Sequence, residues 1–217
     1  MPVKRPSTFL WPERASKPSS PLTLPRVPRE SLNVQPADDR GLPQRYLNHG
    51  ELDVLIALMR LCFVPVMAVE FGVNAGRTAK VVLRSLSSLK HYVGIDVEPW
   101  HVPTLEMQRN EVPKEPGIHA LDDPRFDLMI SRRGSLDLGP ADIGPADIIF
   151  IDGDHSHGVV AHDTTLAYAI VQPGGVIIWH DYNENKAIGV ADVLHAQRKA
   201  GHDIKHVAGT WLAYERA

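Results

Sequence analysis

The stretch VMAVEFGVNAGRTAKVVLRSLSSL, residues 66–89, contains the first clear pattern of a strand followed by a helix. It begins with a short apolar run that closes at Gly72, and residues 77–89 then carry apolar side chains at helical spacing. A short apolar run bounded by glycine is typical of a buried strand, and the spacing that follows is typical of a helix. The stretch therefore predicts a strand, a glycine-containing turn and a helix.

The same alternation repeats along the chain. Further strands are predicted at 92–96, 126–130, 147–152 and 175–179, helices at 50–62, 157–171 and 186–199, and a closing strand pair at 203–207 and 210–214. Residues 100–124 are polar and broken by prolines, so they predict a broken helix or a loop. The pentapeptide GPADI occurs twice in 139–148, first in a predicted loop and then leading into a strand. This order predicts an α/β fold with a doubly wound, mainly parallel sheet covered on both faces and an antiparallel edge.

The composition of the chain excludes several classes of protein. Of its 217 residues, 43% are hydrophobic and 23% are charged, as in ordinary globular proteins, which excludes collagen-like, coiled-coil and wholly disordered chains. The formal net charge of −3 does not favour nucleic-acid binding. The single cysteine, Cys62, suits a reducing compartment. With no long apolar run and no secretory signal, we expect a cytoplasmic protein without membrane contact.

Proline is unevenly distributed. Nine of the 18 prolines lie in the first 43 residues, where they forbid a helix and disfavour a central strand. Residues 1–46 are therefore predicted to be an extended arm or a tail, and residues 47–217 to be the folded domain. We favour an arm that lies on the surface or forms a homo-oligomer, because it carries apolar anchors at Leu10, Trp11, Leu22, Leu24 and Val27.

The turn after the first predicted strand has features of a ligand-binding loop. Gly72 permits a tight turn and Gly76 lets a helix begin close to a ligand. Asp96 ends the next strand, 24 residues after Gly72, where an acid can accept both ribose hydroxyls of a nucleoside. Asn74 replaces the middle glycine of the dinucleotide fingerprint, which disfavours NAD and FAD. Glu70 would supply charge to a cationic, amino-acid-like end of a ligand; the alternative is a plain strand-to-helix turn.

Four segments, VEFGVNAGRTA, YVGIDVEPW, DIIFIDGDHSHGVVAHD and PGGVIIWHDYN, resemble class I S-adenosylmethionine-dependent methyltransferases. Within that class, they resemble the small-molecule O-methyltransferase-like group with IDGDH and HDY signatures. The resemblance covers roughly residues 50–215. It implies a seven-stranded, Rossmann-like sheet whose last strand is antiparallel, and S-adenosylmethionine as the cofactor. Trp100 is expected to stack on the adenine, to cover the pocket, or only to pack.

The resemblance also implies which residues bind the cofactor. It places four of them around the methionine part, Asp96 on the ribose, three beside the adenine, and Asp152 under the amino group or at the reaction centre. The full set of implied cofactor residues is Glu70, Gly72, Asn74, Gly76, Thr78, Asp96, Val97, Gly134, Ser135 and Asp152.

Acids and histidines end two predicted neighbouring strands, and adjacent strands lie about 4.8 Å apart. The candidate catalytic residues are therefore Asp152, His155, His180 and Asp181. In one chemistry, Asp152, His180 and Asp181 bind a divalent metal such as Mg²⁺ or Mn²⁺, which favours the alkoxide form of an acceptor hydroxyl. In the other, no metal binds, and His155 or His180 acts as general base.

The helix after Asp152 carries three further polar residues that are expected to face water: His157, His162 and Asp163. The first functional hypothesis is a methyltransferase that acts on an oxygen of a small molecule. The alternatives are a hydroxylase- or oxidoreductase-like enzyme on the same sheet, and a non-catalytic module whose arm docks on a partner. The acceptor is not identified, and a substrate lid is expected in residues 100–124 and in the arm.

Overall fold

The structure is a computed structural model that describes residues 23–43, 47–48 and 50–217. The predicted anchors Leu10, Trp11 and Leu22 lie outside the described residues. The described residues include 23–43 of the predicted arm and all of the predicted domain except residue 49.

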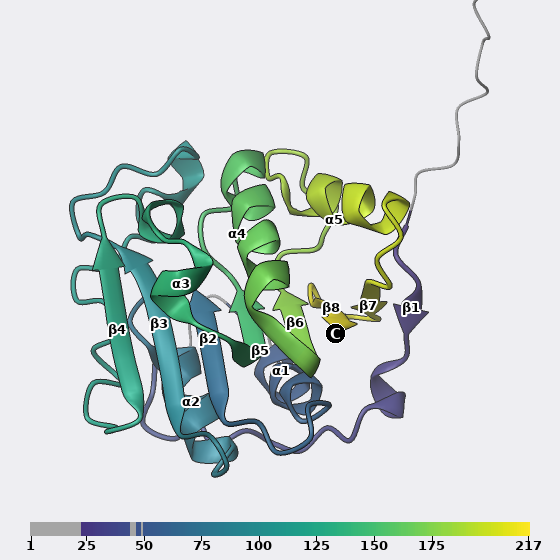
Figure 1. Ribbon diagram of the computed structural model, residues 1–217, viewed down its shortest axis with the longest axis horizontal. Helices are drawn as coiled ribbons and strands as arrows, with labels where there is room; N and C mark the ends of the chain where they lie inside the picture. Colours follow the sequence, from purple (N-terminus) through teal and green to yellow (C-terminus); the bar gives the residue numbers. More distant parts are fainter. Residues whose placement is uncertain (1–22, 44–46, 49) are drawn as a thin grey trace, which may run out of the picture.

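One twisted sheet organises the described part of the chain (Figure 1). Its strands are β1 (Arg26–Val27), β2 (Met67–Phe71), β3 (His91–Val97), β4 (Phe126–Ser131), β5 (Ala146–Ile151), β6 (Val171–Trp179), β7 (Lys205–Val207) and β8 (Ala213–Arg216). Their order across the sheet is β1-β7-β8-β6-β5-β2-β3-β4. The strands from β2 to β6 are mutually parallel, and β8 runs antiparallel to both β6 and β7.

Helices cover both faces of this sheet. They are α1 (Glu51–Met59), α2 (Arg77–Ser85), α3 (Pro140–Ile143), α4 (His157–Ile170) and α5 (Val190–Lys199), with short 3-10 turns η1 (Arg29–Ser31), η2 (Glu106–Gln108) and η3 (Gly134–Asp137). In Figure 1, α3, α4 and α5 lie in front of the sheet, and α1 and α2 lie behind it.

The core consists of two apolar layers, one on each face of the sheet. Strand β5 contributes alternate side chains to them: Ile148 and Phe150 pack with α1 and α2, while Ile149 and Ile151 pack with α4 and α5. Successive side chains of a strand point to opposite faces, so a strand buried on both faces must be continuously apolar. This geometry explains the uninterrupted run IIFI that marked the strand in the sequence.

The predicted fold class is confirmed, with two local differences. The first GPADI copy forms the short helix α3 rather than a loop, because Pro140 takes the first helical position and Gly144, at φ 82°, ends the turn. The predicted helix at 186–199 begins only at Val190. Residues 100–124, predicted as broken helix or loop, contain only the turn η2.

The described part of the predicted arm adds an eighth strand to the implied seven. Strand β1 pairs in parallel with β7 at the edge of the sheet, between Pro25 and Pro28. An edge strand tolerates neighbouring prolines because one side of it needs no ladder partner. Leu24 is buried, and Arg77 pairs with Asp39 at 2.9 Å. Residues 23–43 therefore lie against the domain.

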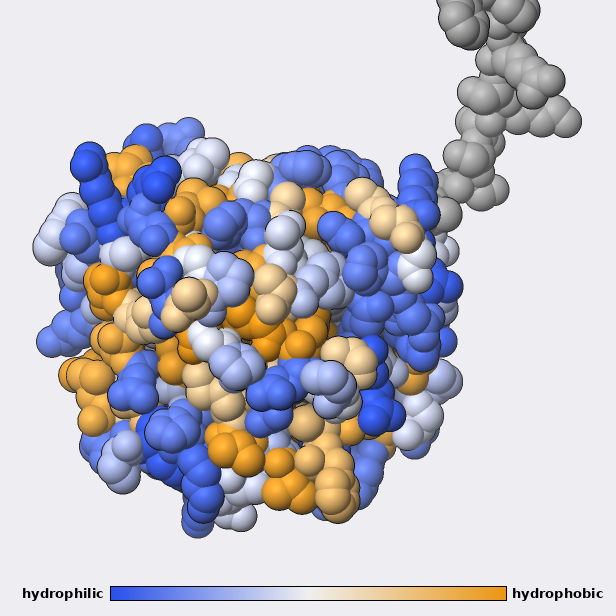
Figure 2. All heavy atoms as spheres, viewed as in Figure 1, coloured by the Kyte–Doolittle hydropathy of each residue, from blue (hydrophilic) through white to orange (hydrophobic). Residues whose placement is uncertain are grey.

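On the face shown in Figure 2, apolar residues are visible between hydrophilic ones in the middle of the view, and further apolar residues lie toward its left and lower edges. No helix in the described ranges combines the length and the apolar character needed to cross a bilayer.

Candidate functional site

A cavity of about 1550 Å³ lies beyond the carboxyl ends of β2, β3, β5 and β6. Ligands of open α/β sheets bind at this edge. Pockets for single drug-sized ligands usually have volumes of about 300–1,000 Å³. The cavity is thus large enough for two ligands side by side.

The turn after β2 requires glycine at its first position. Gly72 has φ 85°, and a Cβ atom there would overlap the Asp152 carbonyl oxygen and the Gly153 Cα. These are backbone atoms of a single segment and cannot move aside as a side chain could, so this turn can pack against the end of β5 only without a side chain. Asn74 follows in the left-handed region at φ 49°, which asparagine tolerates better than most residues.

Gly76 directly precedes α2, and it also lies against the loop that follows η2. A Cβ atom at Gly76 would lie 2.8 Å from the carbonyl oxygen of Gly117, so this glycine admits the loop that follows η2. It is not among the residues that line the cavity, whereas Gly72, Asn74 and Thr78 are.

Glu70 lines the cavity but is almost wholly buried. Burial raises the pKa of its carboxyl well above the usual value, and the Tyr92 hydroxyl, which donates to its Oε2 at 2.8 Å, only partly opposes this. A cationic amino group nearby would lower the pKa again, because an opposite charge favours the ionised form. The carboxyl is therefore placed to pair with a positively charged ligand group.

Asp96 lies at the end of β3 with both oxygens bound to backbone amides. Its Oδ2 accepts from the Asn74 N–H at 2.6 Å and its Oδ1 from the Val97 N–H at 2.7 Å. Each carboxylate oxygen has two acceptor positions, so both can still bind a ligand hydroxyl. Val97, Gly134 and Ser135 line the adjacent part of the cavity. The implied cofactor residues are thus brought together there, Gly76 excepted.

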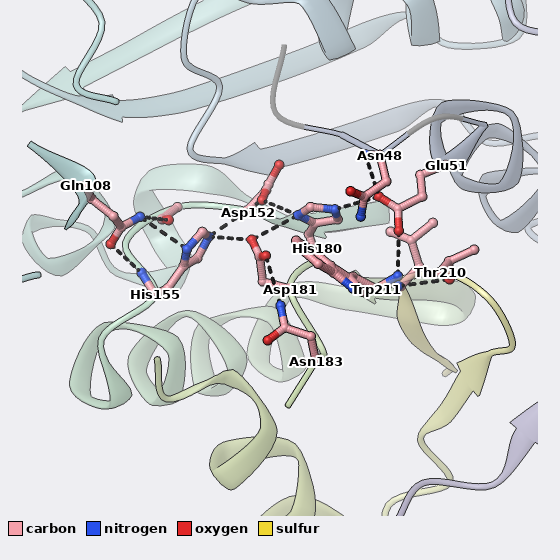
Figure 3. A network of polar contacts seen from close by, with 12 residues as sticks. Asn48, Glu51, Gln108, Asp152, His155, His180, Asp181, Asn183, Thr210 and Trp211 are labelled. Carbon is pink, nitrogen blue, oxygen red and sulfur yellow. Dashed lines mark hydrogen bonds and ion pairs between the residues drawn. The ribbon is translucent and has the colours of Figure 1, made fainter. Parts of the chain in front are cut away.

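Next to the glycine turn, two histidines and three carboxylates form a continuous network (Figure 3). Nδ1 of His180 lies 3.0 Å from Asp181 Oδ2 and 3.1 Å from Asp152 Oδ1, and its Nε2 lies 3.1 Å from Glu51 Oε2. Nε2 of His155 lies 3.1 Å from Asp181 Oδ2. All four predicted catalytic residues therefore meet at one place.

The carboxylates determine the charge of both imidazoles. Burial alone would lower the pKa of His180, but Asp152, Asp181 and Glu51 raise it well above its usual value. The pKa of His155 is also raised, because Asp152 and Asp181 outweigh its burial. In turn, the histidines hold the pKa of Asp152 at about 2 despite its burial. His180 is therefore held as an imidazolium, and the pKa of His155 is shifted in the same direction.

The structure assembles a candidate metal-binding group that differs from the predicted one. Asp152, His155 and Asp181 each offer a ligand atom, and these atoms lie within 4.8 Å of one another. His180 was predicted in place of His155, but both of its ring nitrogens face carboxylates. Nε2 of His155, in contrast, is buried without a well-directed hydrogen bond, as a ligand atom for a metal would be.

Two members of the network could not be recognised from the sequence. Glu51 resembles an ordinary acid in the first turn of a helix, yet its side chain is buried against His180 and its Oε1 accepts from the Trp211 N–H at 2.5 Å. Gln108, from the proline-broken region, accepts from the His155 N–H at 3.0 Å and contacts Nδ1 of the same residue at 3.2 Å. No local motif marks either residue.

Two expectations for single residues were wrong. Trp100 is 73% exposed and does not line the cavity, because its loop turns it outward. Asp163 was expected to face water, but it is only 1% exposed and lines the cavity. Helical spacing contained a signal for it, since Asp163 falls on the buried stripe with Val160, Ala167 and Ile170. His162 is partly buried, and its Nε2 contacts the Ser135 carbonyl oxygen at 3.0 Å; His157 is exposed.

Another part of the cavity wall contains Tyr182, His195 and His206. The Tyr182 hydroxyl lies 2.9 Å from His195 Nε2 and accepts from the Leu24 N–H at 3.2 Å. The ring of Tyr182 meets that of His206 edge-on, with centroids 4.9 Å apart. Because Thr23, Leu24 and Arg26 also line the cavity, the N-terminal segment forms part of the cavity wall, as does the region 101–113.

Comparisons with known proteins agree with this geometry. A family model described as a methyltransferase domain matches residues 69–182, more than half of the chain. Among proteins with curated descriptions, none matches the chain in sequence.

Solved structures share the fold at low sequence identity. The O-methyltransferase NovP is 15% identical, with 87% of each chain covered and a TM-score of 0.59. The O-methyltransferase TomG from Streptomyces achromogenes, solved with SAM, is 16% identical over 87% of this chain and 93% of that one, with a TM-score of 0.55. An O-methyltransferase from Bacillus cereus, solved with SAH, is 16% identical over 81% and 84%, with a TM-score of 0.54.

Proposed function

The chain belongs to the methyltransferase domain family, and from this premise we propose that it transfers the methyl group of S-adenosylmethionine to an oxygen of a small molecule. The observation that carries the proposal is the cavity itself. One part of its wall contains Glu70 and Asp96 and suits the cofactor. The same cavity is also lined by the carboxylates and histidines of the network.

The part of the cavity that suits the cofactor is complementary to S-adenosylmethionine from end to end. Glu70 offers a carboxyl to the cationic amino group, and Asp96 offers two oxygens to the ribose hydroxyls. Gly72 and Asn74 bring backbone close to the methionine part. The adenine would lie against Val97, Gly134 and Ser135, which line the adjacent part of the cavity. The solved relatives that bind SAM and SAH share this fold and support the assignment.

The centre of the cavity supports transfer to oxygen. Methyl transfer is an in-line displacement, so the protein must hold the acceptor oxygen in line with the methyl group and remove its proton. Asp152 and Asp181 concentrate negative charge where that proton must leave. His180, held as an imidazolium between three carboxylates, keeps these acids oriented. The three solved structures described above are O-methyltransferases, which favours oxygen over nitrogen or carbon as the acceptor atom.

A divalent metal fits Asp152, His155 and Asp181, because Nε2 of His155 is buried without a directed partner beside two carboxylates. Such an ion would supply the positive charge that favours the alkoxide form of an acceptor hydroxyl. The pKa of His180, raised well above its usual value, argues against this residue as the general base, because an imidazolium cannot accept a proton. His155 would bind the ion in its neutral form, so the metal would compete with a proton for Nε2. Two carboxylates and one imidazole suit Mn²⁺ better than Mg²⁺.

The test is calorimetric titration of the folded full-length chain with S-adenosylhomocysteine, with NADH as the comparison ligand. We expect binding of the first and none of the second. Heat from NADH alone would favour the oxidoreductase alternative, and a folded sample that binds neither ligand would contradict the proposal. Titration with Mn²⁺ of the wild type and of His155→Ala then tests the metal separately, with binding expected only in the wild type.

A further inference from the structure

Asp163 is a buried carboxylic acid that the proposed chemistry does not use. It lies on the sheet-facing side of α4 and is 1% exposed. Within the described residues its Oδ1 has no hydrogen-bond partner. Buried polar atoms are almost always paired, so an unpaired carboxyl oxygen that lines a cavity needs an explanation. A group of a bound ligand would provide one.

The position of Asp163 in the cavity narrows the choice of ligand group. Helix α4 is joined to η3 by the contact between His162 Nε2 and the Ser135 carbonyl oxygen, at 3.0 Å. Ser135 and Gly134 lie in η3, and the Gly134 backbone packs on Val97. The carboxyl therefore belongs to the part of the cavity where, given the proposed function, the adenine would lie.

The protonation state of the Asp163 carboxyl suits hydrogen bonding to the edge of an aromatic base. Burial raises the pKa of Asp163 to about 7, with the Ser135 side chain opposing and the charge of Asp154 adding to the shift. At neutral pH the group is thus divided between a carboxylate, which only accepts hydrogen bonds, and a carboxylic acid, which also donates one. Adenine presents an amino donor beside a ring-nitrogen acceptor, which the acid form matches at both atoms.

We propose that Asp163 determines the specificity for the cofactor base by accepting a hydrogen bond from the 6-amino group of adenine. The inference rests on the proposed function and adds the residue that recognises this base. It accounts for a polar group that is buried on the apolar side of a helix and whose Oδ1 has no hydrogen-bond partner among the described residues.

The test compares S-adenosylhomocysteine with its analogue that lacks the 6-amino group, by calorimetry. We expect wild type to bind S-adenosylhomocysteine about 10- to 100-fold more tightly than the analogue, as for other well-placed polar contacts to base edges. Asp163→Leu should bind both ligands equally, because it has no acceptor. Asp163→Asn should keep the preference, because its amide oxygen still accepts.

Asp163→Leu is expected to fold, since it removes a buried ionisable group whose Oδ1 is unpaired among the described residues and keeps a similar volume. Asp192→Leu, on the exposed side of α5, is the matched control and should retain the wild-type preference. Equal binding of the two ligands by wild type, or a preference that survives in Asp163→Leu, would overturn the inference while leaving the proposed function intact. A folded wild type that binds neither ligand would instead overturn the proposed function, and the inference with it.

Discussion

At the scale of single residues, Gly72 is the position on which the turn depends. Its φ of 85° and the backbone of Asp152 and Gly153 leave no room for a Cβ atom. We expect Gly72→Ala to lower the free energy of unfolding by at least about 2 kcal/mol, because strain and overlap act together. Urea denaturation measures this change.

Gly158 offers a matched control for that substitution. It lies in α4, and a Cβ atom there would meet nothing within 4 Å. Gly158→Ala should therefore raise stability by about 0.5–1 kcal/mol through helix propensity. If Gly72→Ala were as mild as Gly158→Ala, the close approach of the turn to β5 would be refuted.

Asp163 should make stability depend on pH. Its folded pKa of about 7 lies above the usual value of 3.8, so the folded state binds more protons than the unfolded state between these values. Stability from this group is therefore present at low pH and lost as pH rises from about 4 to 7. At about 1.36 kcal/mol per pKa unit, the loss is of the order of 2–4 kcal/mol.

The measurement is the free energy of unfolding of wild type and Asp163→Asn at several pH values from 4 to 8. The gap between the two proteins should widen with pH in favour of Asp163→Asn. Asp192→Asn serves as the control, because that carboxyl is exposed. Curves for wild type and Asp163→Asn that run parallel would show that Asp163 is not buried as described.

At the scale of elements, Glu51 joins α1 to the ends of two strands. Its carboxylate contacts His180, directly after β6, and the backbone of Trp211, before β8. Burial would raise the pKa of Glu51, but these contacts lower it to about 2, so the side chain is held as an anion. Helix α1 is thereby fixed against the sheet by a buried charge pair as well as by apolar packing.

Replacing that anion should disturb both stability and transfer. We expect Glu51→Gln to cost about 3 kcal/mol of unfolding free energy, because His180 loses one partner while still buried. Methyl transfer should fall while affinity for S-adenosylhomocysteine stays near wild type, since Glu51 does not line the cavity. Glu30→Gln, at an exposed position, should change neither. A stable Glu51→Gln with unchanged turnover would argue against a positioning role.

At the scale of the whole molecule, the N-terminal segment completes both the sheet and the cavity. Strand β1 covers the outer edge of β7, and the buried Leu24 side chain adds to the apolar layer that contains α5. Residues 23–43 also contact α1 and α2 through the Ala37 N–H, which donates to Asp53, and through the pair of Arg77 with Asp39.

Removing residues 1–40 should therefore lower the melting temperature. Leu24→Ala is the matched point change, with an expected cost of about 2–5 kcal/mol for a buried leucine. Scanning calorimetry of both variants beside wild type measures the effect. A truncated protein that melts with the full-length chain would assign residues 23–43 no part in stability.

The sequence was sufficient to predict the central strands, because burial on both faces requires a continuous run of apolar residues. Strand β5 must be apolar at every position to pack on both faces, and glycine must follow β2 to let the turn pass β5. Strand β1 left no such pattern. Two residues between prolines carry no periodicity, and their pairing depends on β7, some 180 residues later in the chain.

For the site too, some features could be predicted from the sequence and others could not. The sequence predicted that acids and histidines would meet at the ends of β5 and β6, because parallel neighbouring strands end at one edge of a sheet. The sequence did not indicate that Glu51 binds Nε2 of His180 or that Gln108 binds His155; these contacts depend on the tertiary structure. Ring orientation and burial depend on groups brought together from distant segments, and no local spacing encodes those distances.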